Sequence, residues 1–212
     1  MRLVFASRNE GKVDEMRALL HGVPIVLLTL DQAGVEFTVV EDQPTFEGNA
    51  RKKSEEVCRA TGLPTLADDS GLEVDLLDGA PGVRSARYAG EKATDAQNNA
   101  RLLAALAAAS AERPDAPRTA RFRCCLALSF SASGPMVRTF VETGSCEGEI
   151  LRAPRGDGGF GYDPLFFVPE TGKTLAEMTM AEKNRVSHRG RAMRHMAERL
   201  RQAVQHGAWR TL

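Results

Sequence analysis

The stretch at 67–71 reads ADDSG and follows a short apolar run, so two neighbouring carboxylates come directly after a segment with the character of a buried strand. Like charges repel each other, and burying an unpaired carboxylate is costly. A cation or a functional role must therefore be found near Asp68 and Asp69 if both are to stay ionised. LPTLA before this stretch and LEVDLL after it both have strand character, and we interpret ADDSG as the turn between them.

Composition limits the classes of protein to which the chain can belong. Its 212 residues suffice for one sizeable core or for two lobes that share a cleft, and 42% hydrophobic with 26% charged residues is ordinary for a globular protein. The 28 basic residues balance the 28 acidic ones, so no overall field attracts nucleic acid or membrane. No apolar run approaches the ~20 residues of a membrane helix, and no signal-peptide core follows Met1. We expect a cytoplasmic protein without nucleic-acid or membrane partners.

The cysteines do not suggest a metal site. Cys58, Cys124, Cys125 and Cys146 show no paired C-x-x-C spacing. We interpret all of them as reduced, buried or half-buried thiols, as is usual in the cytoplasm.

Apolar spacing predicts alternating strands and helices in the first half of the chain. Thr45 and Thr94 are good helix N-caps, and Gly62 followed by Pro64 ends the first of these two helices. We expect strands at 2–6 and 24–30, helices at 13–20, 45–61 and 94–110, and irregular segments at 31–44, 79–90 and 112–118.

The second half changes character. Two long strand patterns at 119–132 and 136–150 flank the turn residues SGP, which predicts an antiparallel hairpin. The loop GDGGFGYDP then leads into the strand LFFVP. A last helix carries the apolar residues Met193, Met196, Ala197, Leu200 and Val204. This order predicts an α/β fold with a long hairpin.

Two stretches have the composition of phosphate sites. SRNEGK at 7–12 lies between a strand and a helix, and a helix N-terminus beside a lysine binds anions well. Alternatively, Asn9 only caps the helix and Lys12 is solvated. RKK at 51–53 is typical of a solvated helix face, yet Lys53 could add positive charge over a phosphate.

Three further stretches could complete a nucleotide site. The carboxylates of ADDSG are the oxygen ligands that Mg²⁺ prefers, although two surface aspartates in a turn would look the same. GFGYDP at 159–164 combines glycines, which let a ligand approach the backbone, with rings that can stack on a base. In EKNRVSHRG at 182–190, His188 and Arg189 can donate hydrogen bonds to a carbonyl oxygen, or simply begin a helix.

Together these stretches supply phosphate anchors, a metal carboxylate, a stacking ring and base-edge donors. The sequence resembles the inosine triphosphate pyrophosphatase family, whose members act on purine triphosphates with non-standard bases. The resemblance implies one domain over 1–212: a two-lobed α/β fold with a mixed sheet, flanking helices and a central substrate cleft, usually assembled as a homodimer. It covers nearly the whole chain and is carried, in order, by SRNEGK, TFEGNA, ADDSGLEVD, GAPGVRSARYAG, GGFGYDPLFF and SHRG.

The resemblance also implies Mg²⁺-dependent hydrolysis of ITP, dITP and XTP to the monophosphate and pyrophosphate, which cleanses the nucleotide pool. Asp69 would be the general base and a ligand of Mg²⁺, which Asp68 would support. Glu41 is the expected second ligand, with Asp42 as its competitor. Such a shared ion would let both aspartates of ADDSG stay ionised.

The resemblance assigns the remaining site residues to the substrate. The segment 7–12 and Lys53 would hold the triphosphate, and Ser70 would touch the substrate. The residues at 160–163 would form a wall around the base and sugar. Lys183, His188 and Arg189 would read the purine. In chain order these residues are Ser7, Arg8, Asn9, Glu10, Gly11, Lys12, Lys53, Ser70, Phe160, Gly161, Tyr162, Asp163, Lys183, His188 and Arg189.

Three rival functions are open on the sequence alone. A nucleotide-binding regulator would keep these contacts without needing Asp69, and a related enzyme could act on modified pyrimidine triphosphates. A nucleic-acid-binding module is disfavoured by the zero net charge and by the lack of an RNA-binding signature.

Overall fold

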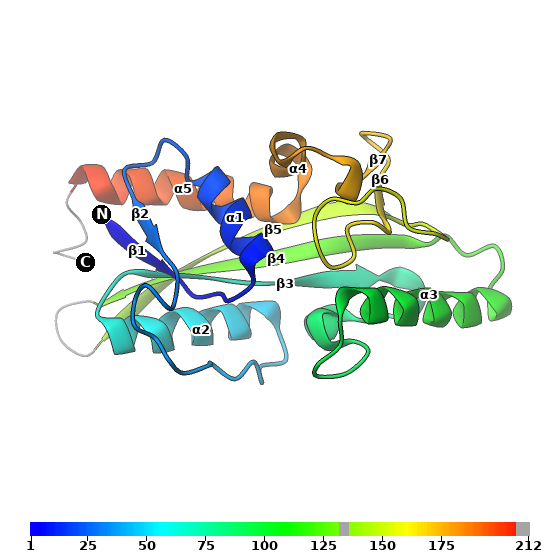
Figure 1. Ribbon diagram of the computed structural model, residues 1–212, viewed down its shortest axis with the longest axis horizontal. Coiled ribbons are helices and arrows are strands. Elements are labelled where there is room, and N and C mark those ends of the chain that lie inside the picture. The colour runs from blue at the N-terminus through cyan, green and yellow to red at the C-terminus, as the bar shows by residue number, and fades with distance from the viewer. Residues whose placement is uncertain (132–135, 207–212) are drawn as a thin grey trace. The chain divides into compact units, whose positions relative to one another are not determined.

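The structure is a computed structural model that describes residues 1–131 and 136–206 (Figure 1). It contains a seven-stranded sheet of order β2-β1-β3-β4-β5-β6-β7 together with helices, which confirms the predicted α/β class. The chain divides into two compact units: unit 1 comprises Met1–Asp69, Cys124–Gly144 and the chain from Arg189 onward, and unit 2 comprises Ser70–Arg123 and Ser145–His188. Among the described helices, none is long and apolar enough to cross a membrane. The central cleft stays a prediction.

Unit 1 begins with parallel strands that helices connect. β1 (Arg2–Phe5) lies between β2 (Val26–Leu28) and β3 (Thr65–Val74) and runs parallel to both. Parallel neighbours need a crossover connection. α1 (Glu10–Leu19) supplies it between β1 and β2, and α2 (Phe46–Thr61) lies on the path from β2 to β3.

The ends of α2 follow the rules that the sequence indicated. The Thr45 hydroxyl accepts a hydrogen bond from the amide of Gly48, and Gly62 ends the helix in the left-handed conformation with φ 65°. The predicted cap and stop are both confirmed.

The interpretation of ADDSG as a turn is wrong, because β3 continues through it from Thr65 to Val74. Side chains of a strand alternate between its two faces, so Asp68 and Asp69 point in opposite directions. Two carboxylates on opposite faces can each find a separate cation. Their sequence adjacency therefore does not require the chain to leave the strand.

The long hairpin is confirmed in its strands. β4 (Thr119–Ser131) and β5 (Val137–Ile150) are neighbours in the sheet, and contacts such as Arg118 with Ile150 and Ser129 with Thr139 show their antiparallel register. The predicted SGP turn and the side chain of Val204 lie outside what the structure describes.

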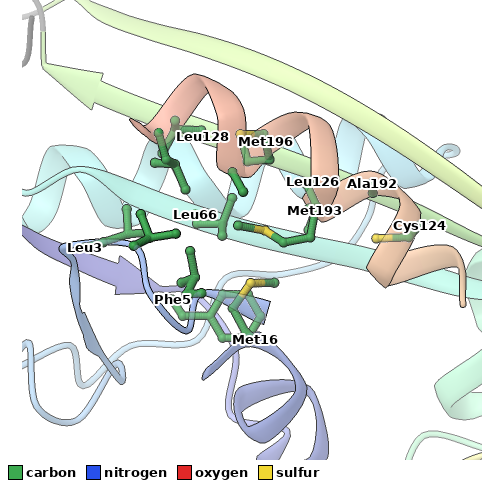
Figure 2. Packing of buried hydrophobic residues seen from close by; sticks show 14 of the residues in the cluster. Leu3, Phe5, Met16, Leu66, Cys124, Leu126, Leu128, Ala192, Met193 and Met196 are labelled. Carbon is green, nitrogen blue, oxygen red and sulfur yellow. The ribbon is translucent and has the colours of Figure 1, made fainter. Parts of the chain in front are cut away.

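The core of unit 1 covers both faces of its strands. Leu3 and Phe5 join a cluster with α1 and α5 (His188–His206), whereas Val4 packs against Val57 of α2. α1 and α5 accordingly lie on one side of these strands and α2 on the other (Figure 1). Figure 2 shows the first cluster, where side chains of β1, β3, β4, α1 and α5 pack together. The predicted apolar residues of α5 are buried: Met193, Met196, Ala197 and Leu200.

Unit 2 has its own core around α3 (Asp95–Glu112). Leu102 and Leu106 of this helix share a cluster with Phe122 and Phe166. Thr94 caps α3 in a capping box with Gln97, as predicted for the cap. The other elements of this unit are η1 (Asp75–Leu77), η2 (Gly82–Arg87), β6 (Phe166–Val168), β7 (Lys173–Thr174), η3 (Leu175–Glu177) and α4 (Met180–Val186).

Three predicted boundaries are corrected. The segment 79–90 contains the 3₁₀-helix η2, in which the Ser85 hydroxyl donates to the carbonyl of Gly82 at 2.6 Å. α3 extends to Glu112, because alanines and glutamate favour a helix and only Pro114 stops it. β2 is shorter than 24–30, since only Val26–Leu28 pairs with β1.

Candidate active site

The predicted phosphate segment lies at the N-terminus of α1. Asn9 is the N-cap, and its Oδ1 accepts from the amide of Lys12 at 3.0 Å. Ser7 Oγ in turn accepts from the amide of Asn9 at 3.2 Å. Asn9 therefore does cap the helix, but the other half of the simpler alternative is wrong: Lys12 is not solvated, because its ammonium pairs with Asp68 and its side chain is only 16% exposed. The first turn of a helix also carries partial positive charge, so capping and anion binding are compatible here.

Arg8 in this segment is already engaged. Its guanidinium pairs with Asp31 and donates to the carbonyl of Val35 at 2.8 Å. Together with Ser7 and Glu10 it lines a cavity of about 470 Å³ beside α1. Three of the six predicted segment residues thus face one cavity.

Asp68 is buried at the centre of an ionic network in unit 1. Its Oδ1 accepts from Lys12 Nζ and, at 3.4 Å, from Arg189 Nη2. Its Oδ2 accepts from Arg189 Nε at 2.9 Å and from Cys124 Sγ at 3.1 Å. Burial alone would raise the pKa of Asp68, but the attraction of Arg189 and Lys12 outweighs it and lowers the pKa well below its usual value. Asp68 is therefore ionised at neutral pH.

Asp69 has fewer partners and a different pKa. Its Oδ1 accepts from Lys53 Nζ at 3.0 Å, and its Oδ2 accepts from Asn49 Nδ2 at 3.2 Å. Burial raises the pKa of this carboxyl group above 3.8, although Lys53 and Lys12 act in the opposite direction. A carboxylate with a raised pKa and lone pairs to spare is suited to accept a proton.

Glu41 and Asp69 meet at one cation. Lys53 Nζ donates to Glu41 at 2.6 Å and to the carbonyl of Asp68 at 2.7 Å, in addition to its bond with Asp69. Burial would lower the pKa of Lys53, but these carboxylates raise it, so the lysine stays charged. Asp42 instead bonds to Lys52 at 2.8 Å. Of the two competitors, Glu41 is the one that shares a partner with Asp69.

Glu41 and Asp69 are so arranged that they could hold Mg²⁺ together. The oxygens of Glu41 and Asp69 both face the position that the Lys53 ammonium now occupies. Mg²⁺ is usually held by one or two carboxylates of the protein, together with waters and substrate phosphates. Glu41 and Asp69 can provide the two carboxylates. Among the side chains that the structure describes, at 1–131 and 136–201, no group of three or more Asp, Glu, His or Cys is arranged to hold a metal ion.

Sequence reasoning missed three residues of this network. Glu15 pairs with Arg189 Nη1, Cys124 donates to Asp68, and Asn49 donates to Asp69. Glu15 had a detectable signal, because it lies four positions before Leu19 of the predicted apolar face, and residues four apart lie on the same face of a helix. Cys124 and Asn49 gave no such signal.

A second group of predicted residues lies in unit 2. Asp163 and Lys183 form a buried pair at 2.5 Å, and Asp163 also accepts from the amide of Phe160 at 2.9 Å. Lys183 Nζ lies 4.8 Å from the centre of the Phe160 ring. A Cβ atom on Gly159, where φ is 72°, would lie 2.1 Å from Asp163 Oδ2, so only glycine fits there. The loop thus holds Phe160, Asp163 and Lys183 together.

The other residues of this loop are fixed by hydrogen bonds. Tyr162 is buried and its hydroxyl donates to the carbonyl of Ser85 at 2.9 Å. Gly161 donates to Asp95 at 2.6 Å and accepts from Asn99 at 2.8 Å. Tyr162 therefore supports the loop from the core side.

His188 and Arg189 are consecutive but belong to different units. His188 stacks on Phe122 in unit 2, with ring centres 4.7 Å apart and planes at 12°. Arg189 is fully buried in unit 1, where it bonds to Asp68 and Glu15. The structure does not test whether they read a purine, nor whether Ser70, half-buried on β3, touches the substrate.

Comparison with known proteins places this arrangement in a family. The model of the Ham1 family matches residues 3–199. A dITP/XTP pyrophosphatase of Geobacter sulfurreducens is 51% identical over 199 residues, covering 94% of this chain and 96% of its own. The dITP/XTP pyrophosphatase of Escherichia coli O157:H7 is 46% identical over 200 residues, with 94% and 98% coverage.

Solved structures agree with the sequence matches. The structure of a HAM1 protein from Coxiella burnetii superposes with a TM-score of 0.84 at 42% identity, covering 96% of this chain and 100% of that one. The Ham1 protein of Staphylococcus aureus gives a TM-score of 0.81 at 36% identity, with 95% and 99% coverage.

Proposed function

We propose that this chain, which belongs to the Ham1 family, is an enzyme that hydrolyses purine nucleoside triphosphates with non-standard bases to the monophosphate and pyrophosphate. The names of its relatives support the reaction class and the substrates dITP and XTP. One observation carries the proposal, and it concerns the two adjacent aspartates. The carboxylate of Asp68 is engaged by Lys12 and Arg189, whereas the carboxylate of Asp69, beside Lys53, can still accept a proton or bind an ion. We add ITP to the expected substrates.

The phosphate tail would bind at the start of α1. Asn9 and the backbone N–H groups of the first turn suit a polyanion, and Lys12 and Lys53 supply positive charge close to the two aspartates. Both lysines are at present paired with carboxylates. The phosphates of the substrate would therefore replace these carboxylates as partners of the lysines. The site is partly dehydrated, so each charged contact is stronger there than in water.

Glu41 and Asp69 would hold Mg²⁺. When bound, the ion would neutralise the triphosphate and stabilise the charge that develops on it. Both carboxylates already lie within hydrogen-bond reach of one cation, which supports this assignment over Asp42. Removal of divalent ions with a chelator should abolish turnover, and added Mg²⁺ should restore it.

Asp69 would act as the general base. It would take a proton from the water that attacks the α-phosphorus, and pyrophosphate would leave with its charge balanced by Lys12 and Lys53. The bond that breaks is the one between the α-phosphorus and the oxygen that bridges to the β-phosphorus. One oxygen of the monophosphate therefore comes from water.

The residues expected to read the base are Lys183, His188 and Arg189. Hypoxanthine and xanthine carry an oxygen at C6, which His188 or Arg189 can satisfy as donors. Adenine carries an amino group there, so a donor would face a donor, and an unsatisfied buried donor costs about 1–3 kcal/mol. A site built on hydrogen bonds can thus reject ATP strongly. Phe160, held beside Lys183, offers a ring for stacking.

A substrate panel tests the proposed function. ITP, XTP, dITP, GTP, ATP and dUTP are incubated with the protein and Mg²⁺, and pyrophosphate and orthophosphate are measured separately. We expect pyrophosphate from the first three at rates far above ATP. Binding without turnover would instead support a regulator, and preference for dUTP would support an enzyme of pyrimidine triphosphates. The cytoplasmic location and the homodimer stay predictions, and light scattering tests the latter.

A further inference from the structure

The oxygens of Asp68 are fully used by donors of the protein. A carboxylate offers about four lone-pair sites. Lys12 and Arg189 Nη2 occupy those of Oδ1, while Arg189 Nε and Cys124 occupy those of Oδ2. A metal ion could bind Asp68 only by displacing one of these donors. Asp69, in contrast, accepts only from Lys53 and Asn49 among the described residues and keeps capacity for an ion.

These donors to Asp68 belong to separate elements. Lys12 belongs to α1, Cys124 to β4 and Arg189 to α5. Arg189 also pairs with Glu15, which follows Lys12 by one turn of α1. Arg189 therefore connects α5 to α1 directly and through Asp68. This arrangement fixes the side chain of Lys12 relative to the strand that carries Asp69.

We propose that Asp68 is a positioning residue and not a metal ligand: it holds Lys12 and Arg189 in place, and the Cys124 thiol orients its carboxylate. The role of Lys12 at the phosphates rests on the proposed function, whereas the separation of Asp68 from the metal does not. This proposal differs from the expectation, drawn from the family resemblance, that Asp68 supports Mg²⁺.

Binding of Mn²⁺ to the substrate-free protein tests the proposal, measured by the loss of the free-ion signal in electron paramagnetic resonance. Asp68→Asn should leave the Mn²⁺ affinity within about threefold of wild type, because only a neighbouring charge is lost. Asp69→Asn and Glu41→Gln, the matched controls, should weaken it by about 10-fold or more. Loss of Mn²⁺ affinity in Asp68→Asn equal to that in Asp69→Asn would overturn the proposal.

Steady-state kinetics on ITP test the positioning itself. Asp68→Asn loosens Lys12, so KM should rise by about 10-fold, the equivalent of one lost hydrogen bond to a charged group. A KM equal to that of wild type would contradict the proposal. Asp68→Asn also removes a negative charge that pairs with Arg189, which could affect folding. A second substitution that removes no charge is therefore needed.

Cys124→Ala and Cys124→Ser form that complement, and they decide the matter if Asp68→Asn does not fold. Alanine deletes the donor to Oδ2 and should raise KM by about threefold with little change in kcat. Serine keeps a donor and should restore KM. A merely structural cysteine would change the melting temperature and not KM, and serine would not rescue it. An unchanged KM in Cys124→Ala, or a failure of serine to restore it, would overturn the role of the thiol.

The two proposals fail separately. The Mn²⁺ measurement uses no turnover, so it decides the role of Asp68 even if the wild type releases no pyrophosphate. Absence of pyrophosphate from every purine triphosphate would refute the proposed function alone.

Discussion

Asp68 and Asp69 are consecutive residues of β3, and their carboxylates bond to different cations: Asp68 to Lys12 and Arg189, Asp69 to Lys53. The alternation of a strand separates the two charges, and each face supplies its own partner. Their pKa values accordingly move apart, downward for Asp68 and upward for Asp69. Of the two, Asp69 is therefore the aspartate that more readily takes up a proton.

Replacement of Asp69 by asparagine should remove turnover without unfolding the protein. The amide keeps the shape of the side chain but cannot accept a proton from water. Loss of a general base typically lowers kcat by about 10²–10⁴-fold, and loss of a metal ligand adds to this. Initial rates of pyrophosphate release from ITP measure the effect.

The control for this variant is its thermal unfolding, which should resemble that of wild type. If Asp69→Asn keeps more than about a tenth of wild-type kcat, Asp69 is not the base.

The pH profile should show an acid limb set by Asp69. A general base must be ionised, so kcat/KM should fall as pH drops through the pKa of Asp69, which lies above 3.8 because of burial. Mg²⁺ binds the ionised form, so a higher Mg²⁺ concentration should move the limb to lower pH. Profiles at two Mg²⁺ concentrations check both points. A limb that does not move with Mg²⁺ would indicate that Asp69 is not a ligand.

The buried pair of Asp163 and Lys183 should be important for stability. Lys183→Met leaves Asp163 buried without its cation, and removal of one partner of such a pair lowers the free energy of unfolding by about 3–5 kcal/mol. Urea unfolding followed by circular dichroism measures this loss.

Two further variants make the test of this pair specific. Lys183→Met with Asp163→Asn should recover part of the loss, because no buried charge then remains. Lys173→Met, which breaks a more exposed pair with Glu182, should cost less than about 1 kcal/mol. Equal losses in Lys183→Met and Lys173→Met would refute the account.

Local rules predicted much of the fold from the sequence. Thr45, Gly62 and Thr94 act as caps because their effect depends only on nearby backbone atoms. The hairpin strands follow from β-rich runs around turn residues. The family resemblance was also readable, because its motifs are long strings in a fixed order.

The rest depended on contacts that are distant in sequence. From the sequence alone ADDSG has the character of a turn, because no cation lies near its aspartates in the chain. The cation that pairs with Asp68 is Arg189, which lies 121 residues further along. Cys124 and Asn49 carry no charge pattern, and although Asn49 belongs to the motif TFEGNA, the motif does not tell that its amide reaches Asp69. The sequence likewise does not tell Glu41 from Asp42 as the partner of Asp69. The structure separates them, because Glu41 pairs with Lys53 and Asp42 pairs with Lys52.

Hydrolysis of ITP in ¹⁸O-labelled water tests the central claim most directly. If water attacks the α-phosphorus under the control of Asp69, mass spectrometry will find one labelled oxygen in the monophosphate and none in the pyrophosphate. Label in pyrophosphate, or release of orthophosphate with a nucleoside diphosphate, would contradict the proposed reaction.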